Sequence, residues 1–137
     1  MNGIDTTQPF IAIRKVEEGS DYDPTMGEFL CNPLDEDLLD VEVSTGGFFS
    51  DPELGVIESL PNVKERMRVP ARGARVFAVS TWDEYREFVL HWLVRYRTES
   101  GGLTTVTFGT FKELDDCESL DVTPMLEGRA FVVPRGA

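Results

Sequence analysis

Residues 87–111 are the most apolar stretch of the chain, and their spacing constrains the fold more than any other feature. Apolar side chains occupy every second position from Phe88 through Trp92 to Tyr96. The intervening positions become polar at the end of this run, where they are Arg95 and Arg97. A period of two residues places the two sets on opposite faces of a β-strand. A second alternating run follows after residues 99–101. We therefore predict a long β-hairpin whose buried face carries Trp92.

The loop of this hairpin sets its register. Glu99-Ser100-Gly101 would form a three-residue loop with Gly101 in the left-handed conformation, which suits a bulged hairpin. Such a loop brings apolar side chains opposite one another across the two strands. The expected pairs are Val94 with Val106 and Trp92 with Phe108.

A helix over residues 82–98 is the alternative, because Trp82, Val89 and Tyr96 also follow helical spacing. The many Val, Phe, Trp, Tyr and Thr residues favour a strand, since these side chains prefer pleated surfaces. The first interpretation is therefore a mainly β fold with at most a short helix near residues 81–86. The alternative is an α+β fold in which the helix lies on an antiparallel sheet.

The rest of the chain contains short apolar or alternating runs that turn residues separate about every ten positions. The expected strands are residues 10–16, 28–32, 39–44, 56–60, 75–80, 120–123 and 129–133, and Gly46-Gly47 is expected to end the third. About seven or eight such strands predict an antiparallel two-sheet sandwich. In strand spacing, residues 10–111 resemble an immunoglobulin-like or fibronectin-type sandwich.

A chain of 137 residues is expected to form a single domain, with loose termini at residues 1–9 and 134–137. No apolar run is long enough for a membrane span, and the N-terminus lacks the pattern of a signal peptide. A cytoplasmic location is therefore expected. Cys31 and Cys117 are too few for a disulfide framework, so we expect them to be reduced, although spacing leaves a single bridge open.

The formal net charge is −12, and it is unevenly distributed. No Lys or Arg occurs between Lys15 and Lys64, whereas the middle of the chain is mildly basic. Binding to DNA or RNA is not expected, because neutralising phosphates requires a positive face. Such segregated charge instead suits association with another protein or with a second copy of the chain.

No motif predicts catalysis, a metal site or a cofactor. His91 is the only His and the first catalytic candidate, but the hairpin points it away from the Trp92 face, as expected of a structural residue. The acidic residues around Asp21 and Asp23 do not match a calcium loop, because Met26 and Asn32 occupy its sixth and twelfth positions. We therefore do not expect an enzyme.

Two short segments are candidate partner-binding sites. Phe48 and Phe49 follow a Gly pair, and adjacent aromatic residues on a loop can anchor a partner. The acidic turn contains Asp35, Glu36 and Asp37, which would attract a basic partner. The function we predict is a non-catalytic β-sandwich module that binds a protein. The alternative is an acidic inhibitor, either an immunity-type protein or a nucleic-acid mimic, that binds a basic partner.

Overall fold

The computed structural model describes residues 4–19, 24–51, 55–58, 62–63, 67–81, 89–111 and 117–135. Within these ranges the regular structure consists of β-strands, and no helix is long and apolar enough to cross a membrane. The strands are β1 (Phe10–Gly19), β2 (Pro24–Cys31), β3 (Leu38–Asp51), β4 (Gly55–Glu58), β5 (Asn62–Val63), β6 (Met67–Val69), β7 (Ala74–Thr81), β8 (Val89–Arg97), β9 (Leu103–Phe111), β10 (Glu118–Asp121) and β11 (Arg129–Val132).

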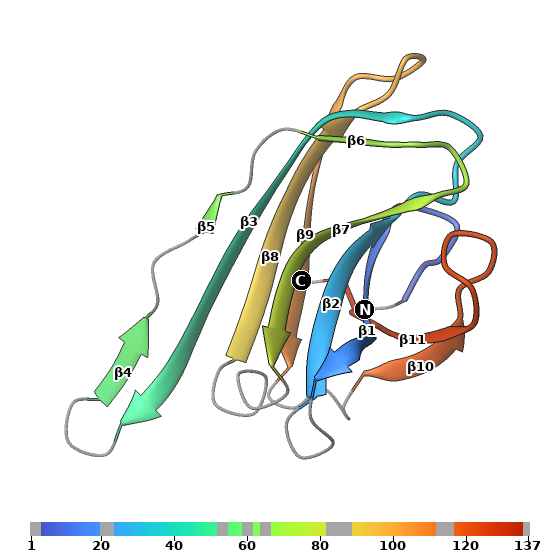
Figure 1. Ribbon diagram of the computed structural model, residues 1–137. Helices are drawn as coiled ribbons and strands as arrows, with labels where there is room; N and C mark the ends of the chain where they lie inside the picture. The colour runs from blue at the N-terminus through green and yellow to red at the C-terminus, as the bar shows by residue number, and fades with distance from the viewer. Residues whose placement is uncertain are drawn as a thin grey trace.

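The strands form two antiparallel sheets (Figure 1). One sheet has the order β10-β11-β1-β2-β7, and the other has the order β4-β3-β8-β9, with β5 and β6 also paired to β3. The predicted two-sheet β-sandwich is confirmed. The alternative helix over residues 82–98 is wrong, because β8 occupies Val89–Arg97. The short helix expected near residues 81–86 falls on residues outside the described ranges, apart from Thr81 at the end of β7.

The register of the β8–β9 hairpin is the predicted one, with Trp92 opposite Phe108 and Val94 opposite Val106. Trp92, Val94 and Phe108 are all buried in the core. The conformation expected for Gly101 is wrong, because its φ is not positive. The backbone N–H of Gly101 instead donates to Thr98 Oγ1 at 3.0 Å, so a side-chain contact closes the loop.

Strand β3 is longer than its sequence predicts. Gly46-Gly47 does not end it, because both glycines pair with β8, opposite His91 and Leu90. A bulge at Asp40, which has a φ of 50°, shifts the register between Leu39 and Glu42. The consequence is that Leu38 is fully buried and Leu39 only half-buried, although alternation with Val41 and Val43 predicts an inward position for Leu39.

Strand β1 is buried on both faces along its first half. The side chains from Phe10 to Ile13 are all at most 1% exposed. The second sheet covers one face, and residues 122–128 between β10 and β11 contribute Val122, Met125 and Leu126 to the core cluster. Strand β2 begins at Pro24, before the strand expected over residues 28–32, and pairs with β1 and β7.

The two ends of the chain make defined contacts next to each other (Figure 1). Ile4 packs against the core, and Arg135 donates a hydrogen bond of 3.2 Å to the carbonyl of Pro9. The carbonyl of Pro134 accepts a hydrogen bond of 2.9 Å from Gly109 on β9. Ile4, Pro9, Pro134 and Arg135 thus make contacts with the sandwich or with each other.

Candidate functional site

The acidic turn of residues 35–37 contacts two other turns of the same protein. Asp35 pairs with Arg72 at 2.6 Å, and Asp37 pairs with Arg68 and accepts a hydrogen bond of 2.8 Å from the backbone of Ala71. Glu36 accepts a hydrogen bond of 3.0 Å from the backbone of Ser100 in the β8–β9 loop. The three carboxylates proposed to face a partner therefore hold neighbouring loops in place.

These hydrogen bonds stabilise the charged forms of the carboxylates. The side-chain and backbone donors of Ser100 lower the pKa of Glu36. The backbone N–H of Ala71, followed by Arg68, lowers the pKa of Asp37. Both side chains are therefore ionised at neutral pH and retain their hydrogen bonds.

Asn32 lies beneath this turn and is completely buried. Its Nδ2 donates to the carbonyls of Glu36, Val69 and Pro70 at 2.8, 3.3 and 3.1 Å. Its Oδ1 accepts from the backbone N–H of Leu34 at 3.0 Å. One amide thus fixes the turn after β2 to the turn between β6 and β7. Sequence reasoning missed this residue, because its partners on the second turn lie more than thirty positions away.

The remaining sequence candidates lie apart from this cluster. The backbone of Phe48 and Phe49 belongs to β3, paired with β4, so they do not occupy the loop predicted for them; their side chains lie outside the described part of the structure. The imidazole of His91 is exposed on β8. Within the described ranges, no group of three or more His, Cys, Asp or Glu residues could hold a metal ion.

Cys31 and Cys117 are both buried, and no disulfide joins them in this structure. Burial raises the pKa of Cys31 to about 12. A thiolate is the reactive form of cysteine, so its formation at Cys31 is strongly disfavoured at neutral pH.

Strand β7 is an edge of the five-stranded sheet and carries two exposed aliphatic side chains. Val76 is 46% exposed, and Val79 is 60% exposed. Val76 is paired with Phe29 and Val79 with Gly27, so the two valines share the outer face with the half-buried ring of Phe29. An edge strand with such a face can accept an additional strand.

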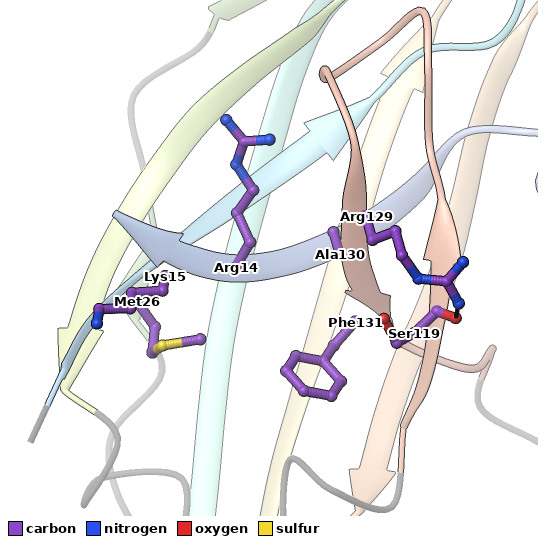
Figure 2. A pocket seen from close by; sticks show the side chains of 7 residues that line it. All are labelled: Arg14, Lys15, Met26, Ser119, Arg129, Ala130 and Phe131. Carbon is purple, nitrogen blue, oxygen red and sulfur yellow. Dashed lines mark hydrogen bonds between the residues drawn. The ribbon is translucent and has the colours of Figure 1, made fainter. Parts of the chain in front are cut away.

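A pocket opens on the same sheet, between the ends of β1 and β11 (Figure 2). Its volume is about 250 Å³. The lining side chains belong to β1, β2, β10 and β11 and are Arg14, Lys15, Met26, Ser119, Arg129, Ala130 and Phe131. Among the residues that the structure describes, the lining contains three basic side chains and no acidic one, and Asp121 lies opposite Arg129 in the β10–β11 pairing.

The sequence matches no protein-family model and no curated protein.

Proposed function

We propose that the protein is a non-catalytic β-sandwich module that binds another protein through the edge and outer face of β7. The observation that carries this proposal is the exposure of Val76 and Val79 on an edge strand of eight residues. Exposed aliphatic residues beside an open strand edge supply both backbone hydrogen bonds and apolar contacts to an incoming strand. A second copy of the chain could provide that strand, as could a different protein.

The ion pairs of the acidic residues also favour β7, rather than the acidic surface, as the partner-binding site. Asp35 and Asp37 pair with Arg72 and Arg68, and Asp40 pairs with Arg97 at 2.7 Å. A basic partner of an inhibitor or nucleic-acid mimic would compete with these arginines for the carboxylates, of which Asp35 is still 86% exposed. The immunoglobulin-like arrangement and the cytoplasmic location stay predictions from the sequence.

The proposal is tested by affinity capture from the source cell, combined with light scattering. The unmodified protein is expected to recover a stoichiometric partner or to form a dimer. Val79→Lys is expected to abolish either association, because a charged side chain on an edge strand opposes pairing. Leu103→Lys is the matched control, since Leu103 is 62% exposed but lies on the other sheet.

Hydrogen exchange locates the contact. In the complex, amide exchange is expected to slow along β7 and to stay unchanged along the first residues of β9. Recovery of no stoichiometric partner, together with a monomer in light scattering, would overturn the proposal. Equal loss of association in Val79→Lys and Leu103→Lys would also count against it.

A further inference from the structure

Strands β2 and β7 form a strip with few charges at one edge of a strongly acidic protein. The whole chain has 25 Asp and Glu against 13 Lys and Arg. In these two strands of eight residues each, the charged residues are Glu28 and Arg75. Glu28 is only 3% exposed and therefore does not contribute a charge to the surface. A strip of this kind suits a partner surface that is also nearly uncharged, because a charge buried against it would lose its water without gaining an opposite charge.

The opposite edge of the same sheet differs from β7. That edge is β10, which has four residues and exposes Glu118 and Asp121 at its two ends. Short length and charged side chains both oppose pairing with a further strand. At the edge of the other sheet, β9 is partly covered, because the N–H of Gly109 donates to the carbonyl of Pro134 at 2.9 Å. Strand β7 is twice as long as β10 and contains no acidic residue. It is therefore better suited than β10 to pairing with a further strand.

A bulge in β7 places its two exposed valines on the same face. Val76 and Ala78 pair with consecutive residues of β2, so Phe77 is the extra residue of the bulge. In a regular strand, residues three positions apart point to opposite faces of the sheet. The extra residue shifts this alternation by one position. Val76 and Val79 therefore both point outward, where they are 46% and 60% exposed.

The residues of β7 are arranged almost symmetrically about this bulge. A valine adjoins it on each side, followed outward by a polar residue and then by a small one, in Ala74-Arg75-Val76 before it and Val79-Ser80-Thr81 after it. A two-fold symmetric dimer needs such a pattern, because each contact between two different residues occurs twice. Two antiparallel copies of β7, related by a two-fold axis beside the bulge, place Val76 of each copy opposite Val79 of the other.

This arrangement also avoids opposing like charges within the contact. Arg75 of each copy lies opposite Ser80 of the other copy, which is neutral. The valines of both copies form one apolar cluster, next to the half-buried ring of Phe29, which pairs with Val76 on the same face. Removal of these side chains from water favours association. The net charge of −12 on each copy opposes association at long range, and salt screens that repulsion.

We propose that the partner of β7 is a second copy of the same chain, and that the two β7 strands pair antiparallel about the bulge in a two-fold symmetric dimer. The five-stranded sheets of the two copies then join into one continuous sheet. Pairing is irregular at the bulge itself, so the valine pairs on either side of it make the contact. The inference rests on the proposed binding role of β7 and names the partner that β7 binds.

Sedimentation velocity over a series of protein concentrations tests the dimer. A monomer–dimer equilibrium is expected, and the dimer is expected to become stronger as salt is raised, since two acidic copies repel each other less. Val76→Lys and Val79→Lys are each expected to weaken the dimer about ten-fold or more, because each places a charge inside the contact. Leu103→Lys is the matched control, since it changes the net charge equally at an exposed site on the other sheet and is expected to leave the dimer intact. A monomer at every concentration, or an equal effect of Leu103→Lys, would overturn the inference.

Cysteine crosslinking tests the register. Val76→Cys and Val79→Cys are prepared as separate proteins and oxidised alone and as a mixture. Residues directly opposite each other have Cα atoms roughly 4.5–5.5 Å apart, within reach of a disulfide. Two copies of the same valine would be roughly 8 Å apart or more, which is too far. A crosslinked dimer is therefore expected only in the mixture.

The unmodified protein is the control for this oxidation, because Cys31 and Cys117 are buried and are expected to form no crosslink. Circular dichroism of each variant checks that the fold is retained. Crosslinks that form equally in each single variant, or in none of the three samples, would overturn the inference.

Failure of the inference can be distinguished from failure of the proposed function. A monomer in sedimentation, together with capture of a different protein that Val79→Lys abolishes, would overturn the second copy as partner and leave the binding role of β7 intact. A monomer that captures no partner would overturn both. A dimer that is equally strong in Val79→Lys would place the contact elsewhere and would also overturn both.

Discussion

Trp92 Nε1 donates a hydrogen bond of 2.7 Å to Glu28 Oε1, and this contact joins the two sheets inside the core. Trp92 lies on β8 and Glu28 on β2, and both side chains are at most 3% exposed. A buried polar group that loses its partner costs roughly 1–3 kcal/mol, whereas a satisfied pair fixes how two surfaces meet. The contact therefore contributes to the alignment of one sheet on the other.

Substitution of Glu28 and Trp92, singly and together, is expected to show that the two side chains are energetically coupled. Glu28→Leu removes the acceptor, and Trp92→Phe removes the donor and part of the packed ring system. Each is expected to lower the free energy of unfolding by about 2–4 kcal/mol, and the double variant by less than the sum. Urea unfolding followed by circular dichroism measures all three. Effects that add to within ~0.5 kcal/mol would show that the hydrogen bond carries no coupling.

Asn32→Asp is expected to be severely destabilising at neutral pH. The change replaces an Nδ2 donor with an oxygen, at a site where Nδ2 contacts the carbonyls of Glu36, Val69 and Pro70. Carboxylate burial against carbonyl oxygens costs about 3 kcal/mol or more. Asn32→Ala is the comparison and is expected to cost less, because it removes the donor without adding a charge. A larger loss for Asn32→Ala, measured by urea unfolding, would contradict this account.

Gly27→Ala tests the close packing of the outer face of β2. A Cβ at Gly27 would lie 2.8 Å from Phe29 Cε2 and 3.0 Å from Val16 Cγ1, so the ring must move. The expected cost is about 1–3 kcal/mol in thermal or urea unfolding. At Gly102 a Cβ meets nothing within 4 Å. Gly102→Ala is therefore the control, with a change of at most ~1 kcal/mol, and similar losses at both glycines would contradict the packing argument.

Glu36→Gln is expected to change how stability depends on pH. The pKa of Glu36 is lower in the folded protein than in the unfolded chain, because Ser100 donates two hydrogen bonds to the carboxylate. Its contribution is therefore present above the unfolded pKa of about 4.3 and is lost as pH falls through the folded pKa. The difference in urea midpoint between the two proteins is expected to be constant near neutral pH and to shrink in acid. Glu118→Gln, which removes an exposed charge on β10, is the control and is expected to show no such trend.

The β8–β9 hairpin could be predicted because residues close together in the sequence determine it. Two alternating runs and one loop determine that Trp92 meets Phe108, and no distant residue is needed. The end of β3 could not be predicted in this way. Gly46 and Gly47 are poor strand residues, but pairing with β8 satisfies their backbone and overrides that preference.

The candidate sites depended on contacts between distant residues. Sequence alone showed acidic residues at positions 35–37, but not that Arg68, Arg72 and Ser100 would be folded against them. The basic pocket brings Arg14 together with Arg129 from the opposite end of the chain. No local pattern connects these residues, since their proximity follows from the pairing of β1 with β11.

That pairing has a consequence for how the molecule assembles. Strand β2 follows β1 closely in the sequence and is synthesised soon after it. The other neighbour of β1 is β11, so Ala12 can pair with Val132 only after almost the whole chain has been synthesised. Such long sequence separations slow folding, since a large loop must close before the contact is gained. A ribosome-bound chain that has not yet released β11 would leave one side of β1 open, so the β1 amides directed towards β11 should be among the last to gain protection.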